Sequence, residues 1–218
     1  MSKNLGPVHY MMYEKIKFQD EVTYFLMDGN TEKIDAKIPP VSKNPLDEII
    51  DQDNIHGFLS SKIDVVENRL NMAFAMADKI DEKLYELGKS KASEKNFSSL
   101  EEVFQDLNTY LLDGMPCDNA LSAMMDDEGS LFLVTNENLH KKYENFINPE
   151  ASLDAECGGG HGHDHHDSFD IKEDEDINLK EEDSFYHKKR LEFLKGYFEE
   201  SPYQVDLVNG INYKIYKK

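Results

Sequence analysis

The feature that most constrains the fold is a stretch rich in glycine, histidine and acid that interrupts the apolar pattern of the chain. Residues 157–167 read Cys-Gly-Gly-Gly-His-Gly-His-Asp-His-His-Asp, inside a segment from Glu150 to Asp183 with 13 Asp or Glu against 2 Lys. This composition offers too little apolar surface to offset the entropy lost on ordering. We therefore expect one integrated domain with a helical body over residues 1–149, a disordered acidic linker over 150–182, and a C-terminal helix and hairpin over 183–218 packed on the body.

The chain before this segment carries apolar residues with the period of a helix. That spacing predicts a first helix over residues 5–27 and a second, longer helix over residues 53–87 that ends at Gly88. A serine followed three residues later by a glutamate predicts a third helix over residues 100–112. Helices of this length need antiparallel partners to cover their apolar faces, so we expect the body to resemble a helical bundle.

Between the first helices and the acidic segment the pattern is more varied. Three prolines between residues 30 and 46 predict an extended connector. Residues 116–125 predict a short helix, and residues 137–147 return to the helical pattern. Residues 130–135 have the apolar and β-enriched composition of a short strand.

The C-terminal part combines a helix with a hairpin. Residues 184–200 predict the helix. Two alternating strands, residues 203–208 and 211–216, flank Asn209 and Gly210, the pair preferred in a type I′ turn. An isolated hairpin is marginal in water, so it must pack on helices or pair with the strand predicted before the acidic segment. The expected fold class is therefore mainly α, with a helical bundle-like body and a small antiparallel β element, becoming α+β at the C-terminus.

The acidic segment concentrates side chains that bind metal ions. Four of the eight histidines lie within residues 161–166, and three glycines precede them. Neutral imidazole binds Zn²⁺, Ni²⁺, Cu²⁺ and Co²⁺, and close spacing lowers the entropy lost in gathering several ligands. We predict a divalent transition metal, nickel or zinc, as the cofactor. The candidate ligands are His161, His163, His165, His166, Asp164, Asp167 and Cys157.

In composition, residues 157–167 resemble the His-rich segments of nickel metallochaperones and the loops of zinc transporters. The resemblance is confined to this segment and implies storage, sequestration or transfer of a metal ion. The segment lacks the two pairs of ligands, at set spacing, that hold a structural zinc ion. The alternative interpretation is a solvated linker whose histidines bind no metal.

Two other functions compete with metal handling. The first is a helical protein-interaction or regulatory module with no metal requirement, which would bind a protein partner through its apolar faces. The second is a metal- or cofactor-dependent enzyme in which His9, His56 and Glu67 converge inside the helical body. We expect instead that His9 and His56 lie at the edge of the core and bond to backbone or carboxylate groups. We expect His140 and His187 to lie on solvated helix faces.

No catalytic residue is predicted from the sequence. The chain lacks the Gly-x-Ser-x-Gly and His-Glu-x-x-His motifs and a phosphate-binding glycine loop. Cys117 has no histidine close to it in sequence that could activate it, so a buried structural cysteine is the simpler interpretation. We therefore favour a function other than catalysis.

Charge and cysteine content limit the partners and the compartment. The net charge of −20 argues against nucleic acid and anionic membranes as partners, because phosphate groups bind to basic surfaces. Two cysteines, Cys117 and Cys157, are too few for a disulfide framework and favour a reducing cytosol. The sequence shows no apolar run that approaches the roughly 18 residues of a membrane span.

Overall fold

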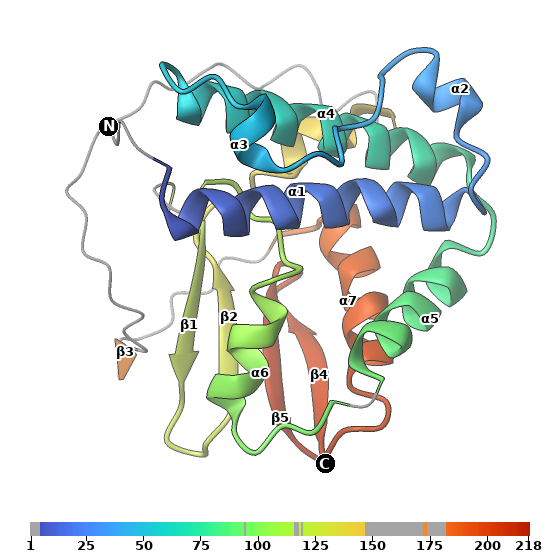
Figure 1. Cartoon of the computed structure of the whole chain (residues 1–218). Helices are drawn as coiled ribbons and strands as arrows, with labels where there is room; N and C mark the ends of the chain where they lie inside the picture. Colours follow the sequence, from blue (N-terminus) through green and yellow to red (C-terminus); the bar gives the residue numbers. More distant parts are fainter. Residues whose placement is uncertain (1–4, 94, 116–117, 119, 147–171, 174–181) are drawn as a thin grey trace.

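The structure of the chain is a computed structural model that describes residues 5–93, 95–115, 118, 120–146, 172–173 and 182–218. Those residues form seven α-helices, a 3₁₀ helix and a five-stranded sheet (Figure 1). The expected fold class, mainly α with a small antiparallel β element, is confirmed.

Helices α1 (Pro7–Leu26) and α4 (Ile55–Met76) pack against each other. Proline suits the first position of α1 because its missing N–H would have no partner there. The helix stops before Asp28 and Gly29, whose φ angles of 50° and 77° are incompatible with a right-handed helix. The first helix is therefore confirmed, with each end within two residues of its predicted place.

The single helix predicted over residues 53–87 is wrong, because the chain breaks there into two helices. Asn54 caps α4 through its side chain. The helix ends before Ala77, which is extended, and α5 (Ile80–Ala92) begins after Lys79, whose φ is 55°. Neither glycine nor proline marks this break. It directs α5 away from α4 and onto the C-terminal helix, so tertiary packing decides where the helix stops.

Helices α5 and α7 (Phe185–Tyr197) approach each other closely through two glycines. A Cβ atom on Gly88 would lie 1.9 Å from the carbonyl oxygen of Phe193. A Cβ atom on Gly196 would lie 1.9 Å from the carbonyl oxygen of Tyr85. Gly88 is therefore a packing residue inside α5, and the prediction that it ends a helix is wrong. The helix predicted for the C-terminal part is confirmed.

Three shorter helices lie between the longer ones. The first, α2 (Glu32–Asp35), interrupts the connector predicted to be extended over residues 30–46, and the second, α3 (Leu46–Ile49), begins at its end. The third, α6 (Leu100–Leu107), begins at Ser99, whose hydroxyl accepts the backbone N–H of Glu102 at 3.3 Å. The predicted start of this helix is confirmed, and its end comes five residues earlier than predicted.

The strands join into one sheet of order β3-β1-β2-β5-β4. The central β2 (Leu131–Thr135) pairs antiparallel with β1 (Leu121–Met125) on one side and with β5 (Asn212–Lys217) on the other. β5 also pairs antiparallel with β4 (Tyr203–Val208), and the two-residue β3 (Lys172–Glu173) pairs in parallel with β1. The C-terminal hairpin is therefore stabilised by the strand that precedes the acidic segment.

Two local predictions on this sheet have opposite outcomes. Asn209 and Gly210 both have positive φ, 51° and 78°, as a type I′ turn requires, so the predicted hairpin is confirmed. The helix predicted over residues 116–125 is wrong, because β1 occupies its second half. Oδ1 of Asp126 accepts the backbone N–H of Ser130 at 2.7 Å and stabilises the turn that brings β1 onto β2. Strand pairing overrides the local preference here.

The last element before the acidic segment is η2 (Lys141–Phe146), a 3₁₀ helix in place of the α-helix predicted over residues 137–147. It contacts both α4 and α7. In Figure 1, α1 and α4 cross above the ends of the strands, while α5 and α7 lie beside the sheet. The main apolar core lies between these helices and the sheet.

Candidate functional site

A cluster of polar side chains is buried where α1, α4 and α7 meet the stretch before η2. Each of its six members is at most 9% exposed to solvent. Polar side chains are seldom buried so completely unless they are paired. We call this set the His140 cluster. Its members are Gln19, Glu67, Asp113, His140, Tyr186 and Arg190.

His140 lies at the centre, and each of its ring nitrogens faces a carboxylate. Nδ1 lies 3.1 Å from Oε2 of Glu67 on α4, and Nε2 lies 3.4 Å from Oδ1 of Asp113 in the loop after α6. The imidazole stacks on the ring of Tyr186 on α7, with centroids 3.5 Å apart and planes inclined by 11°. His140 therefore connects the stretch before η2 to three other parts of the fold.

Arg190 brings a permanent positive charge to the cluster from α7. Nη1 donates to Oδ1 of Asp113 at 2.7 Å. Nη2 donates to the carbonyl oxygen of Leu112 at 3.0 Å and to Oη of Tyr186 at 2.8 Å. Nη2 also lies 3.2 Å from Nε2 of His140. Tyr186 and Arg190 are four residues apart, so one face of α7 presents both side chains.

Gln19 connects α1 to the same cluster. Its Nε2 donates to Oε1 of Glu67 at 3.1 Å and to Oη of Tyr186 at 3.2 Å. Both oxygens of the Glu67 carboxylate therefore have partners, one in Gln19 and the other in His140. A buried carboxylate needs such partners, because an unpaired charge in a low-dielectric interior is strongly unfavourable.

The charges of the cluster shift one another's pKa values. Burial opposes ionisation of His140, but the Glu67 carboxylate and the hydrogen bond to Asp113 raise the pKa of His140 above its ordinary 6.5. Burial also opposes ionisation of Asp113, yet the Arg190 guanidinium and His140 hold the pKa of that carboxyl well below its usual range. Burial raises the pKa of Tyr186, which stays neutral and serves as a hydrogen-bonding partner.

His187, the residue after Tyr186, is buried without a charge. Burial and the nearby Arg190 lower the pKa of His187 from 6.5 to about 2. Its Nδ1 lies 2.8 Å from Oη of Tyr213 on β5, which also donates to the backbone oxygen of His187 at 3.2 Å.

The prediction that His140 and His187 lie on solvated helix faces is wrong, since they are 3% and 0% exposed. α7 is covered by η2 on one side and by the sheet on another, which its own sequence does not reveal.

The His140 cluster leaves little space for a bound molecule. Cavities of about 10 and 40 Å³ border it, which is room for water rather than for an organic substrate. The Arg190 guanidinium already lies where a cation would bind between Asp113 and His140. Within the described part of the chain, no group of three or more His, Cys, Asp or Glu could hold a metal ion. The arrangement can hold helices together and can gain or lose a proton.

The three residues considered for a buried enzyme site do not converge. The rings of His9 and His56 lie 5.7 Å apart, at the beginnings of α1 and α4. Glu67 lies eleven residues after His56, about 16 Å along α4 at 1.5 Å per residue, and belongs to the His140 cluster. Nδ1 of His9 accepts the backbone N–H of Gly6 at 2.9 Å, so this histidine is bonded to the backbone, as expected.

The predicted metal ligands lie outside the residues that the structure describes. They are His161, His163, His165, His166, Asp164, Asp167 and Cys157.

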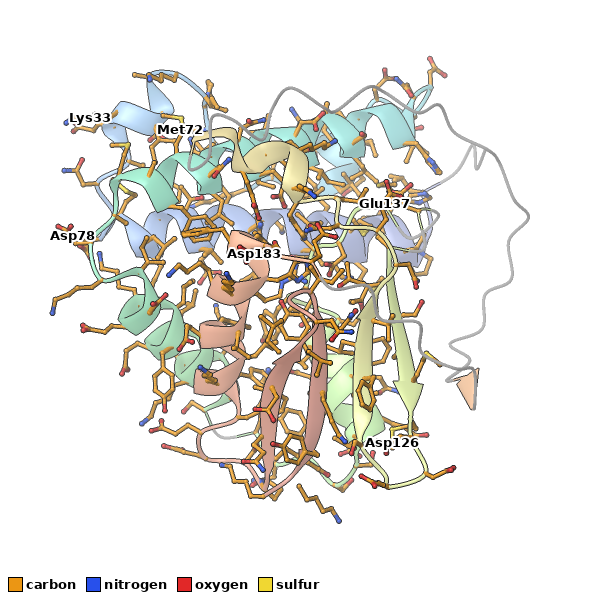
Figure 2. All side chains as sticks on the ribbon, turned by 180° about the vertical axis from the view of Figure 1, so that it is seen from behind. Lys33, Met72, Asp78, Asp126, Glu137 and Asp183 are labelled. Carbon is orange, nitrogen blue, oxygen red and sulfur yellow. The ribbon has the colours of Figure 1, made fainter. Side chains whose placement is uncertain are left out.

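The chain on either side of the predicted ligands is held together by hydrogen bonds. Oε1 of Glu144 accepts the hydroxyl of Ser184 at 2.9 Å and the backbone N–H of Tyr186 at 3.0 Å. Oε1 of Glu182 accepts the side-chain amide of Asn138 at 2.9 Å. Figure 2 labels Glu137 near the upper end of β2 and Asp183 at the beginning of α7. Glu144 and Ser184 therefore lie next to each other, while Lys172 and Glu173, which come between them in sequence, pair with β1.

Sequence reasoning missed most of the His140 cluster, although one signal pointed to it. The chain has two arginines, Arg69 and Arg190, among 24 basic residues. Both are buried and paired with aspartate: Nε of Arg69 lies 2.6 Å from Oδ1 of Asp20. A guanidinium stays charged and binds carboxylates in a defined geometry, so a rare arginine in a lysine-rich chain is a candidate for a buried pair.

Comparison of the chain with known protein families, curated proteins and solved structures finds no match. None of the helices in the described residues is long and apolar enough to cross a membrane. What the described residues define is an α+β protein in which a buried charge cluster joins the helices at the base of an acidic, histidine-rich segment.

Proposed function

We propose that the protein binds a divalent transition metal through residues 157–167, for storage, sequestration or transfer of the ion. The observation that carries the proposal is the presence of four histidines in six residues, with aspartates among them and a cysteine close before. Imidazole, carboxylate and thiolate groups suit Ni²⁺ and Zn²⁺, the two ions that we favour.

The fold of the described residues is consistent with such a role. Glu144 and Ser184 join the described residues on the two sides of the segment, and the predicted metal ligands take no part in that hydrogen bond. The described residues contain no group that could hold a metal ion. We therefore expect any metal that the whole protein binds to be held by residues 157–167.

The test compares metal binding by three proteins made without a His tag. A variant with His161, His163, His165 and His166 changed to Gln removes the imidazoles. A matched control changes four acids of the same segment, Asp154, Asp170, Asp174 and Asp176, to Asn and keeps every predicted ligand. Calorimetric titration with Ni²⁺ and Zn²⁺, with metal content measured by elemental mass spectrometry, gives affinity and stoichiometry.

We expect the histidine variant to lose most of its affinity for the metal and the aspartate control to keep it. Equal loss in both variants would mean that the acidic charge of the segment, and not imidazole ligation, attracts the ion. Undiminished binding by the histidine variant would contradict the proposal. If neither ion binds even to the unaltered protein, the proposal fails and the alternative of a protein-interaction module gains support. Such a module could bind through the exposed apolar side chains of Tyr10, Phe25 and Met76.

We further propose the cytosol as the site of action, with neither nucleic acid nor an anionic membrane as a partner. The support is the small number of cysteines and the net charge of −20. Reaction of both Cys117 and Cys157 with a thiol-reactive label would show that the two thiols are free, which is consistent with this location. A disulfide between them would contradict it.

A further inference from the structure

We infer that His140 is a proton-dependent latch that holds the stretch 138–146 against α4 and α7, closed when its imidazole is charged and loosened when it is neutral. The inference does not depend on metal binding. It rests on the hydrogen-bonding capacity of the ring, on the charge of its neighbours and on the contacts made by residues 138–146.

The first argument is the number of protons that the ring must supply. An imidazole carries N–H groups on both nitrogens only when it is protonated. In this structure Nδ1 faces Oε2 of Glu67 at 3.1 Å and Nε2 faces Oδ1 of Asp113 at 3.4 Å. Both oxygens belong to carboxylates, which accept hydrogen bonds and cannot donate them when ionised. Only the imidazolium form can therefore donate to both carboxylates.

The second argument concerns Arg190, which can donate to Nε2 of His140 once that nitrogen has lost its proton. Its Nη2 has two hydrogens, and it already faces the carbonyl oxygen of Leu112 at 3.0 Å and Oη of Tyr186 at 2.8 Å. Nε2 of His140, at 3.2 Å, becomes a third acceptor when the ring loses its proton. Deprotonation thus breaks the bond to Asp113 and makes three acceptors compete for two hydrogens.

The third argument is charge balance. With the imidazolium, two positive groups, His140 and Arg190, contact two carboxylates, Glu67 and Asp113, in a buried network. A neutral ring leaves one carboxylate charge without compensation among these contacts, which a low-dielectric interior disfavours. The pKa of His140 is raised above 6.5 in accordance with this balance, although burial alone would lower it.

Other titratable groups face the cluster from each neighbouring element. Lys15 on α1 donates to Oδ1 of Asn108 at 2.7 Å, and burial lowers the pKa of Lys15 to about 8. His187 on α7 stays neutral, and burial raises the pKa of Tyr213 on β5. Lys15 is therefore the other group of this region that can titrate above neutral pH, so the test must separate His140 from Lys15.

What the latch controls is the packing of the stretch 138–146. Oη of Tyr143 donates to Oδ1 of Asp64 on α4, and Glu144 accepts two donors at the start of α7. The backbone N–H of Tyr143 also donates to the carbonyl oxygen of His140 at 2.9 Å. Loosening His140 weakens this packing and with it the closure of the chain between Glu144 and Ser184.

The first test reads the proton on His140 directly. Nitrogen-15 NMR of the imidazole rings is recorded across the pH range in the full-length protein with a chelator present, and the His140→Gln variant assigns the signal. We expect most His140 rings to carry protons on both nitrogens at pH 6.5, the ordinary pKa of histidine, and to lose one at a higher pH. A neutral ring at pH 6.5 or below would overturn the inference.

The second test measures whether the proton controls packing. Amide hydrogen exchange at Tyr143, corrected for the intrinsic pH dependence, reports how often η2 opens. As pH rises through the pKa of His140, we expect protection in the unaltered protein to fall by up to about tenfold per pH unit. In His140→Gln, whose residue 140 has no proton to lose, this fall should be absent. Lys15 is present in both proteins, so its contribution cancels in the comparison.

Two further variants extend this experiment, one as a control and one as an independent test. His56→Gln removes a histidine outside the cluster and should behave as the unaltered protein. Glu67→Gln keeps the size of the side chain but removes the charge that faces Nδ1, so it should lower the pKa of His140 and shift the loss of protection to lower pH. If protection at Tyr143 depends on pH equally in the unaltered protein and in His140→Gln, the latch is excluded.

Discussion

Gly88 and Gly196 lie opposite each other's helices in the contact between α5 and α7, where a Cβ atom on either would come within 1.9 Å of a backbone oxygen of the other helix. A flexible side chain could move aside from such an approach, but a helical backbone cannot. The two helices can therefore pack this closely only because both positions carry a hydrogen atom in place of a side chain. The position of α7 and of its charged side chains depends on this close packing.

This contact predicts that Gly88→Ala and Gly196→Ala each destabilise the protein. A clash with backbone must be relieved by separating the helices, which typically costs about 1–3 kcal/mol in the free energy of unfolding. Because both Cβ positions lie only 1.9 Å from backbone oxygen, we expect the upper part of this range, which exceeds the helix propensity of about 1 kcal/mol gained by alanine. Urea unfolding followed by circular dichroism measures the change, with Glu86→Ala on the exposed face of α5 as the control. An increase in stability for either glycine variant would contradict the close packing.

A second prediction concerns the pair formed by Arg190 and Asp113. Arg190→Met leaves a buried carboxylate without its main partner, so we expect a loss of about 3–5 kcal/mol in the free energy of unfolding. The double variant Arg190→Met with Asp113→Leu removes both charges, and it should be more stable than Arg190→Met alone. Lys188→Met, an exposed position on the same helix, should change stability by less than about 0.5 kcal/mol. Additive losses in the double variant would show that the two residues are not coupled.

The third prediction concerns His187 and the loss of protein stability at acidic pH. Its pKa is lowered to about 2 in the folded protein, against 6.5 for an ordinary histidine. Between these values the unfolded chain binds a proton that the folded protein does not, so His187 makes stability fall as pH decreases below 6.5. The slope from this one group approaches about 1.4 kcal/mol per pH unit.

The His187→Gln variant removes that titration and leaves the carboxylates unchanged. We expect its free energy of unfolding to depend less steeply on pH than that of the unaltered protein between about pH 4 and pH 6. The difference between the two curves isolates His187, because every other group contributes to both. Parallel curves would mean that His187 is protonated in the folded protein.

The elements that could be predicted from sequence are those whose signals are local. Pro7 and the Asp28–Gly29 turn delimit α1, and Asn209 and Gly210 adopt the positive φ angles that asparagine and glycine tolerate best. Such signals act within a few residues, and a single sequence displays them. The break between α4 and α5 has no such signal, because it arises where α5 turns to meet a helix about a hundred residues later in the chain.

The same reasoning explains why the predicted functional residues and the observed cluster do not coincide. Clustered histidines in residues 161–166 are visible in the sequence, whereas Glu67, Asp113 and Arg190 are brought together only by folding. Glu67 and His140 are 73 positions apart, and Asp113 and Arg190 are 77 apart. The burial of His140 and His187 is not visible in sequence for this reason: each is followed by two lysines, and the groups that bury it come from other elements.

A last prediction concerns Glu144, which joins the chain before the acidic segment to the start of α7. Its Oε1 accepts the hydroxyl of Ser184 and the backbone N–H of Tyr186. Glu144→Ala leaves both donors without this acceptor and opens the segment, so we expect a loss of about 1–3 kcal/mol in the free energy of unfolding. Glu137→Ala, an exposed position nearby, is the control.

Deleting residues 157–167 should by contrast leave the free energy of unfolding nearly unchanged. The cost of closing a loop depends only weakly on its length, and the contacts of Glu144 with Ser184 and Tyr186 are retained. Thermal unfolding of the metal-free proteins measures both effects. If the deletion destabilises the protein as much as Glu144→Ala does, the segment contributes packing of its own, and loss of metal in that deletion could no longer be attributed to the ligands alone.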